Sequence, residues 1–153
     1  MQTNYIVVHH LNPEINKIRK IDSILQANGI MLYPSDTGFS LGCMLSNKLG
    51  CEKIRKLKAV SSKKPLTFLC SSFRSASDFV RINDSAFNVM KKLCPGPFTF
   101  IMPSLRNVPS NIYDEKRKTV GVRICSSPFV HAVLNIVSEP LISISALNDD
   151  RQD

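Results

Sequence analysis

The sequence has no long apolar run and carries no basic segment ahead of a hydrophobic one. Its longest apolar stretches, such as residues 5–8 and 120–122, fall far short of the roughly 20 residues that a membrane-spanning helix needs. The pattern of a secretory signal is also missing from the first residues. We therefore expect a cytoplasmic protein that does not engage a membrane.

The motifs of several common sites are absent as well. The six glycines form neither a G-x-x-x-x-G-K-[ST] loop nor a G-x-G-x-x-G turn, so any ATP chemistry must use another scaffold. The five cysteines are an odd number without a C-x-x-C pair, and the three histidines form no ligand spacing. This pattern disfavours a disulfide framework and a metal site on the protein, and we expect most cysteines to be reduced and buried.

What is present suits one folded domain over residues 1–153. That length buries roughly 70% of the surface of the unfolded chain, and 43% hydrophobic residues supply the core. The pattern predicts a first helix from an N-cap at Asn12 and Pro13 to a stop at Asn28-Gly29, and further helices at 47–58, 84–93 and 127–137. Strands are expected at 5–9, 30–33, 66–70, 98–102, 119–124 and 141–145. The alternation predicts an α/β domain with a mixed sheet.

Basic residues are concentrated in one segment. Residues 48–64 hold seven Lys or Arg against the single acid Glu52, which accounts for six of the eight surplus positive charges of the chain. Such a segment is either a solvated helix face or a surface that attracts polyanions. It directly follows the polar loop at residues 34–42, and that loop follows a strand, where α/β sheets collect ligands.

Three other polar features are candidates for a site, and each has a structural alternative. Residues 94–99, which include Thr99, hold a Pro-Gly-Pro sequence that on its own is a rigid turn. Arg123 ends a strand and is either paired with an internal acid or directed at an anionic ligand. The polar residues of the segment 143–148 either line a site or form the polar face of a strand.

Taken together and in order, five segments resemble the YrdC/YciO family over about residues 5–148. They are Pro34–Gly42, Lys56-Leu57-Lys58 with Pro65-Leu66, Pro95–Phe100, Val122-Arg123-Ile124 and Pro140–Ala146. The resemblance implies a twisted α/β fold with a large basic concave cavity. In the catalytic members it implies synthesis of L-threonylcarbamoyladenylate from L-threonine, bicarbonate and ATP, for modification of the adenosine beside the anticodon of tRNA. Family members have also been described as binding double-stranded RNA.

The resemblance also implies the site residues and magnesium that arrives with ATP. Carboxylated threonine must attack the α-phosphate and expel pyrophosphate, so the site needs cations for the phosphates. By position in the family motifs, the expected catalytic residues are Lys56, Lys58 and Arg123. The expected substrate-binding residues are Ser35, Asp36, Thr37, Thr99, Ser143, Ser145 and Asn148.

The sequence departs from the catalytic pattern at two of these positions. Lys58 replaces an Arg, which keeps the charge but loses the bidentate fork. Leu147 stands where the family's S-x-N motif has Asn, and Asn148 comes one residue late. The chain also ends soon after this motif. These departures and the longer loop at residues 59–64 indicate the YciO branch, and they leave a non-catalytic protein that binds double-stranded RNA or a nucleotide as the alternative function.

Overall fold

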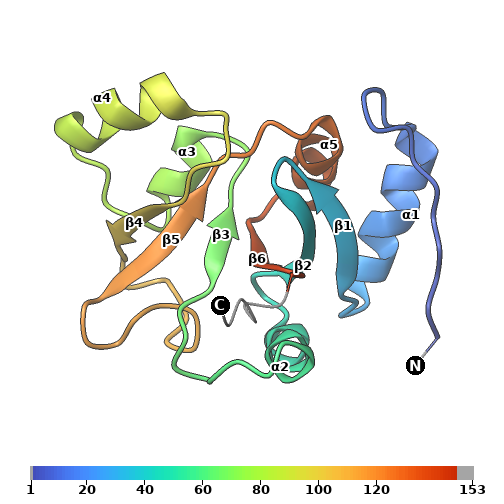
Figure 1. Cartoon of the computed structure of the whole chain (residues 1–153), viewed down its shortest axis with the longest axis horizontal. Coiled ribbons are helices and arrows are strands. Elements are labelled where there is room, and N and C mark those ends of the chain that lie inside the picture. The colour runs from blue at the N-terminus through green and yellow to red at the C-terminus, as the bar shows by residue number, and fades with distance from the viewer. Residues whose placement is uncertain (1, 148–153) are drawn as a thin grey trace, which may run out of the picture.

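A six-stranded mixed sheet carries the fold of the computed structural model, which describes residues 2–147 (Figure 1). Its strands are β1 (Met31–Ser35), β2 (Gly38–Met44), β3 (Thr67–Leu69), β4 (Phe100–Pro103), β5 (Thr119–Arg123) and β6 (Leu141–Ser145). They lie in the order β1-β2-β6-β3-β5-β4. The β3/β5 pair is parallel and the other neighbours are antiparallel, so the expected mixed sheet is confirmed.

Five helices flank this sheet. They are α1 (Ile15–Gln26), α2 (Lys48–Leu57), α3 (Phe73–Ser77), α4 (Asp84–Leu93) and α5 (Pro128–Val137). In Figure 1, α1 and α5 lie beside the β1/β2 hairpin, α2 lies below the sheet, and α3 and α4 lie beyond β3 and β5. Within residues 2–147, no helix is both long and apolar enough to cross a bilayer.

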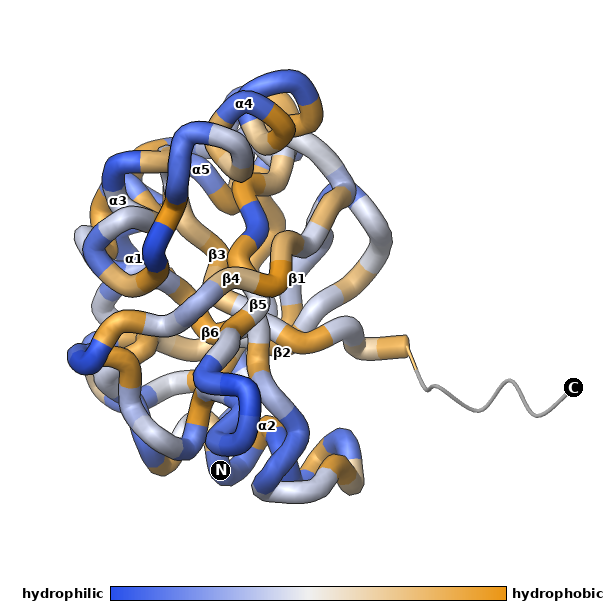
Figure 2. Tube along the Cα trace, turned by 90° about the vertical axis from the view of Figure 1, so that its left-hand side faces the viewer, coloured by the Kyte–Doolittle hydropathy of each residue, from blue (hydrophilic) through white to orange (hydrophobic). Residues whose placement is uncertain are grey.

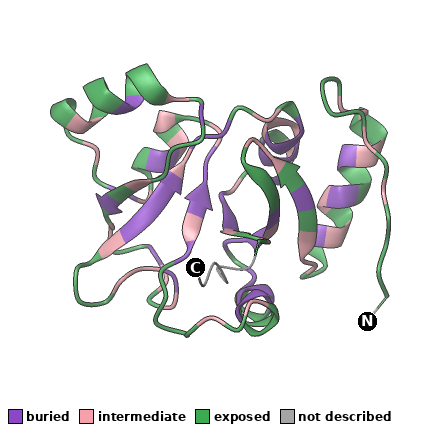
Figure 3. Cartoon of the chain, in the orientation of Figure 1, coloured by how far each residue is buried: buried purple, intermediate pink, exposed green. Residues whose placement is uncertain are grey.

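The two faces of the sheet bury separate cores. Leu69 and Leu141 point to the face covered by α1 and α5, whereas Phe68 and Ile142 point to the other face and pack with Ile54 of α2. This alternation follows from the two-residue period of a strand. Figure 2 shows the hydrophobic segments gathered along the strands, and Figure 3 shows β3 and β5 buried while α4 is mostly exposed.

The first helix forms as predicted but begins later. Ile18, Ile21 and Leu25 recur every three to four residues and are all buried, which explains why this segment is helical. The predicted start at Asn12 and Pro13 is wrong, because the N-cap is Glu14 and the first helical residue is Ile15. The Glu14 carboxylate accepts a hydrogen bond from His9 N at 3.0 Å, which holds the preceding chain in a loop.

The expected strand at residues 5–9 is also wrong. This segment pairs with no other strand in the described part of the chain. Its alternating pattern instead packs Ile6 and Val8 on the core that α1 and α5 share, while Tyr5 and Val7 face solvent. Alternating apolar residues therefore serve here to cover a helix rather than to extend the sheet.

Residues 34–44 hold the largest difference from the expected elements. We expected a strand that stops before Pro34 and then a loop, but β1 runs through Pro34 and residues 38–44 form β2. Pro34 is tolerated because β1 lies at the edge of the sheet, where a missing backbone N–H breaks no ladder. The short helix α3 was not predicted.

Two asparagines cap helices, and their burial predicts different costs of removal. Asn47 is 2% exposed, accepts from Gly50 N at 2.8 Å and donates to Gly29 O at 3.2 Å. Asn83 is exposed, and its side chain accepts a hydrogen bond from Ala86 N at 2.8 Å. We expect Asn47→Ala to lower the free energy of unfolding by about 2 kcal/mol and Asn83→Ala by about 1 kcal/mol, measured by urea denaturation. Equal losses would contradict the bridging role of Asn47.

Candidate functional site

The turn between β1 and β2 is the first part of the site, and its shape is fixed locally. The Ser35 hydroxyl donates to Gly38 O at 2.9 Å and accepts from Thr37 N at 3.3 Å. Gly38 has φ +117°, a conformation that strongly favours glycine. The turn therefore holds Asp36 and Thr37 at the tip of the hairpin in one arrangement.

An ion pair joins this turn to the end of β5. Arg123 Nη2 donates to Asp36 Oδ1, and Arg123 Nη1 donates to Thr37 Oγ1 at 3.1 Å. The second carboxylate oxygen, Asp36 Oδ2, accepts from Ser126 N at 3.0 Å and Ser126 Oγ at 3.3 Å. The structure thus brings Asp36 and Thr37 of one predicted segment together with Arg123 of another, and it adds Ser126, which gave no sequence signal.

This pairing limits what Arg123 can offer a ligand. The side chains of Arg123 and Asp36 are only 13% and 10% exposed, so the guanidinium charge is balanced by a partly buried carboxylate. Arg123 Nε is buried and has no hydrogen-bond partner. Of the two possibilities left open by the sequence, the structure has the Arg paired with an acid.

A row of small and hydroxyl-bearing residues crosses the centre of the sheet. The strand register places Gly42 opposite Ser143, Ser143 opposite Thr67, and Thr67 opposite Gly121. Residues paired in this way point to the same face. Leu69 and Arg123 lie two residues further along on that face, so the row shares it with the ion pair and with the core under α1 and α5.

Gly42 gives Tyr33 the room to reach across β2. A Cβ atom on Gly42 would lie 2.9 Å from Tyr33 Cε1 and 3.0 Å from Ile142 O. The Tyr33 hydroxyl instead passes over the glycine to the Ser143 hydroxyl, at 2.7 Å. Burial raises the pKa of Tyr33, so its phenol stays protonated and can donate. Tyr33 therefore orients the Ser143 hydroxyl, which is itself only 8% exposed.

Gly121 has the same effect on the other side of the row. A Cβ atom there would lie 3.0 Å from Thr67 Oγ1 and 3.0 Å from Thr99 Cγ2. The glycine therefore leaves room above β5 for two side chains, Thr67 from β3 and Thr99 from the segment before β4. Thr99 is exposed and Thr67 is half-buried, so this part of the row is open to solvent.

The end of β6 brings in one of the two predicted lysines. Lys58 Nζ donates to Leu147 O, and Leu147 N donates to Ser145 Oγ at 3.2 Å. The register places Ser145 opposite Ser40 on the face that carries Ser143. Asn148, which we expected to bind substrate, lies outside the described residues.

Lys56 lies in different surroundings from Lys58. It lines a hollow of about 300 Å³ with residues that belong to α2 and the loop after it: Glu52, Arg55, Ala59, Val60 and Ser62. No other predicted site residue lines this hollow. Neither Thr99 nor Arg123 lines the hollow that holds Lys56. The basic concave cavity implied by the resemblance therefore stays a prediction.

The basic segment itself divides into one structural and several surface cations. Arg55 is 8% exposed and donates to the carbonyl oxygens of Ser61, Lys64 and Asn111 at 2.7–2.8 Å. Arg55 thus holds the loop after α2 in place. Five cations of the segment are exposed, namely Lys48, Lys53, Lys56, Lys63 and Lys64.

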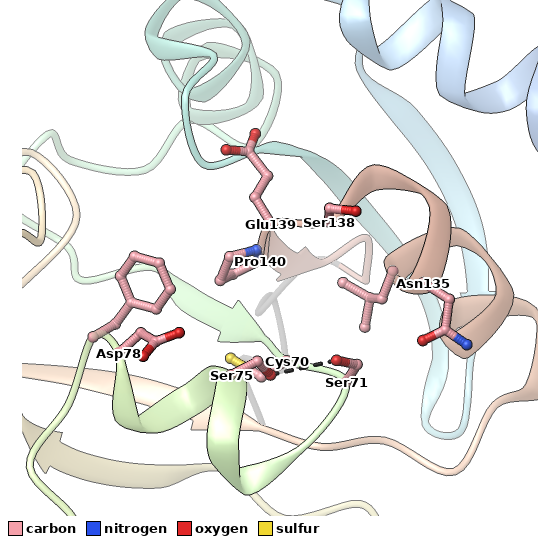
Figure 4. A pocket seen from close by; sticks show the side chains of 10 residues that line it. Cys70, Ser71, Ser75, Asp78, Asn135, Ser138, Glu139 and Pro140 are labelled. Atoms are coloured by element: carbon pink, nitrogen blue, oxygen red, sulfur yellow. Dashed lines mark hydrogen bonds between the residues drawn. The ribbon is translucent and has the colours of Figure 1, made fainter.

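A second hollow, of about 280 Å³, lies between the end of β3, α3 and the end of α5 (Figure 4). Cys70, Asp78 and Asn135 are among its lining residues, and none of the predicted site residues is. Burial raises the pKa of the Cys70 thiol to about 12, so this cysteine is not a ready nucleophile.

The described residues offer no evident protein site for a metal ion. Among residues 2–147 there is no group of three His, Cys, Asp or Glu side chains that could hold one. Asp36 is the acid of the turn, and both of its oxygens already accept hydrogen bonds. The donor set therefore does not fit a resident magnesium ion, and magnesium would enter only as part of an ATP complex.

A comparison with family models and known proteins gives a consistent relationship. The Sua5/YciO/YrdC family model, described as "Telomere recombination", matches residues 23–152. The uncharacterized protein YciO of Escherichia coli K12 is 31% identical over 145 residues, which cover 95% of this chain and 70% of YciO. The threonylcarbamoyl-AMP synthase of Psychromonas ingrahamii is 32% identical over 136 residues, covering 87% of this chain and 69% of the synthase.

Solved structures share the fold. The crystal structure of E. coli YciO has a TM-score of 0.85 at 32% identity and covers 90% of this chain. The present chain spans 66% of that YciO chain. The crystal structure of P. abyssi Sua5 complexed with L-threonine has a TM-score of 0.81 at 23% identity and covers 88% of this chain and 39% of Sua5.

The ion pair predicts a large coupling between its two members. Asp36→Asn and Arg123→Met should each lower the free energy of unfolding by about 2 kcal/mol, because each leaves a partly buried group without its partner. The double variant should lose clearly less than the sum, with a coupling of about 2 kcal/mol in a denaturant-based double-mutant cycle. Additive losses would show that the pair does not hold the turn to β5.

Proposed function

The chain belongs to the Sua5/YciO/YrdC family, and we propose that it is a nucleotidyltransferase that makes L-threonylcarbamoyladenylate from L-threonine, bicarbonate and ATP. The product would serve the threonylcarbamoyl modification of tRNA in the cytoplasm. Relatives named threonylcarbamoyl-AMP synthases, and a fold shared with a Sua5 that binds L-threonine, support this proposal.

The observation that carries the proposal is the row of hydroxyls beside the Asp36–Arg123 pair. Ser143, Thr67 and Thr99 lie on or beside one sheet face, where Gly42 admits the Tyr33 ring and Gly121 admits the side chains of Thr67 and Thr99. A small amino acid with a hydroxyl, an ammonium and a carboxylate needs such a set of short polar partners. We assign threonine binding to this row, together with Ser35, Asp36, Thr37 and Ser145 of the surrounding segments.

The proposed reaction requires cations where charge develops. An oxygen of the carboxylate that bicarbonate has added to the threonine nitrogen attacks the α-phosphorus of ATP. A P–O bond forms there, and the bond from the α-phosphorus to pyrophosphate breaks. Lys58 makes one hydrogen bond to a neutral carbonyl, so its positive charge is not balanced by that contact. Arg123 is already paired, which makes Lys58 and Lys56 the better candidates for stabilising the phosphates.

This proposal predicts activity and its loss in lysine variants. Purified protein with L-threonine, bicarbonate, ATP and magnesium should release pyrophosphate and form the adenylate, measured by a coupled phosphate assay and by mass spectrometry. Lys58→Ala and Lys56→Ala should each lower the rate by roughly 10²-fold. Lys91→Ala, which removes an exposed lysine of α4, should leave the rate unchanged. Pyrophosphate release that does not depend on threonine would contradict the proposal.

Binding to double-stranded RNA is the second candidate function, and the five exposed lysines of residues 48–64 favour it. Each lysine that meets a phosphate releases counterions, so affinity should fall steeply with salt. We expect a plot of log K against log salt concentration with a slope between roughly −3 and −5 for a duplex RNA. Lys53→Ala combined with Lys63→Ala should make the slope shallower by about 2. A flat plot would rule out a phosphate-driven mode.

A further inference from the structure

Two buried thiols lie in contact between β2 and α2. Cys43 Sγ and Cys51 Sγ are 3.6 Å apart, and the residues are 0% and 1% exposed. Cys43 is near the end of β2 and Cys51 is in the first turn of α2. The short connection between them turns at Asn47, whose carbonyl oxygen lies 3.8 Å from Cys43 Sγ.

We propose that Cys43 and Cys51 form a reversible intramolecular disulfide when the protein meets a hydroperoxide. A disulfide has an S–S length of about 2.05 Å, so the sulfurs must approach by roughly 1.5 Å. A rotation of one thiol side chain with a small movement of α2 supplies such an approach. The two sulfurs already face one another, so no strand has to leave the sheet.

The surroundings of the two thiols indicate different roles for them in disulfide formation. The pKa of Cys51 is lowered: its hydrogen bond with Cys43 and the charge of Arg55 lower it, and together they outweigh burial, which raises it. The pKa of Cys43 is raised by the same hydrogen bond and by burial. Cys51 also lies in the first turn of α2, where the helix dipole favours a thiolate. Cys51 is therefore the attacking sulfur and Cys43 the resolving one.

The chemistry balances with the peroxide as the only co-reactant. The Cys51 thiolate attacks one peroxide oxygen, so an S–O bond forms, the O–O bond breaks, and hydroxide leaves and takes a proton to become water. Cys43 sulfur then attacks the sulfenic sulfur of Cys51, so the S–S bond forms, the S–O bond breaks, and a second water leaves with the thiol proton. Two electrons pass from the two sulfurs to the peroxide.

Other cysteines of the core are placed differently. Cys125 belongs to the core on the opposite face of the sheet, under α1 and α5. Cys70 shares the core of the pair but has a hydrogen bond to the Ser75 side chain, and its pKa is raised to about 12. Burial also raises the pKa of the half-buried Cys94, so the disulfide should be selective for one pair among five thiols. It would tie α2, the helix that carries Lys56, directly to β2.

The test uses the native protein and hydrogen peroxide. After peroxide treatment, free thiols are alkylated in denaturant and the intact mass is measured. We expect the loss of two hydrogen atoms and three alkylated cysteines where the untreated protein has five. Trypsin cuts after Lys48, which lies between the two cysteines, so the Cys43 and Cys51 peptides should stay together only until dithiothreitol is added.

Matched variants separate the pair from general oxidation. Cys51→Ser should leave Cys43 free for alkylation after the same treatment, whereas Cys70→Ser, which removes an equally buried thiol, should still form the linked peptides. The peptide map of the unaltered protein decides the matter even where a variant fails to fold. Sulfinic acid at either cysteine without a link, five thiols still alkylated, or links that involve Cys70, Cys94 or Cys125 would each overturn the proposal.

Discussion

The contact between Asp36 and Arg123 is the constraint on which the arrangement of the site depends. It joins the tip of the β1/β2 hairpin to the end of β5, residues that are far apart in the sequence and in the strand order. Because both side chains are largely withdrawn from water, each needs the other to offset the cost of burying its charge. Ser126 adds two donors to the carboxylate and so ties the start of α5 to the same point. Hairpin, sheet and helix therefore meet at one carboxylate, and the hydroxyl row lies on the face beneath it.

Glycine determines what can lie on that face. At Gly42 the missing side chain admits the ring of Tyr33, and at Gly121 it admits the methyl of Thr99 beside Thr67. A larger residue at either position would push a polar group off the sheet rather than merely crowd the core. The polar face thus depends on glycines in β2 and β5. The hydroxyl groups of neighbouring segments lie over these glycines, where a larger side chain would displace them. This explains how a sheet face continuous with an apolar core can still present a site.

Much of this could be predicted from the sequence, and the rest depended on contacts that leave no local pattern. The helix over residues 128–137 was predicted almost to the residue, since a Ser-Pro cap and a regular apolar period mark it. The strand over 141–145 was predicted with the bounds that the structure has. The strand β2 was missed because its glycines are typical of a turn, although only Gly38 serves the turn and Gly42 makes the long-range contact with Tyr33. Family resemblance picked out Asp36, Thr37 and Arg123, and the structure brings them together. Ser126 contributes its backbone N–H to Asp36, and Tyr33 contributes its hydroxyl to Ser143. Both contacts join residues far apart in the sequence, so neither leaves a local sequence signal.

The distribution of charge changes how the site should bind anions. Arg123 lies beside the hydroxyl row, yet its charge is already balanced by Asp36, so it contributes a fixed position rather than an unbalanced positive charge. Other positive charge lies on Lys56 of α2 and on Lys58 just after it, and Lys58 reaches the end of β6 through Leu147 O. The proposed substrates would thus meet two different surfaces. The hydroxyl row is neutral and rigid, whereas the lysine ammonium groups are charged and flexible. Lysines can follow phosphates that move during bond cleavage, whereas a paired guanidinium cannot. That division suits a reaction in which an amino acid must be held still while pyrophosphate departs.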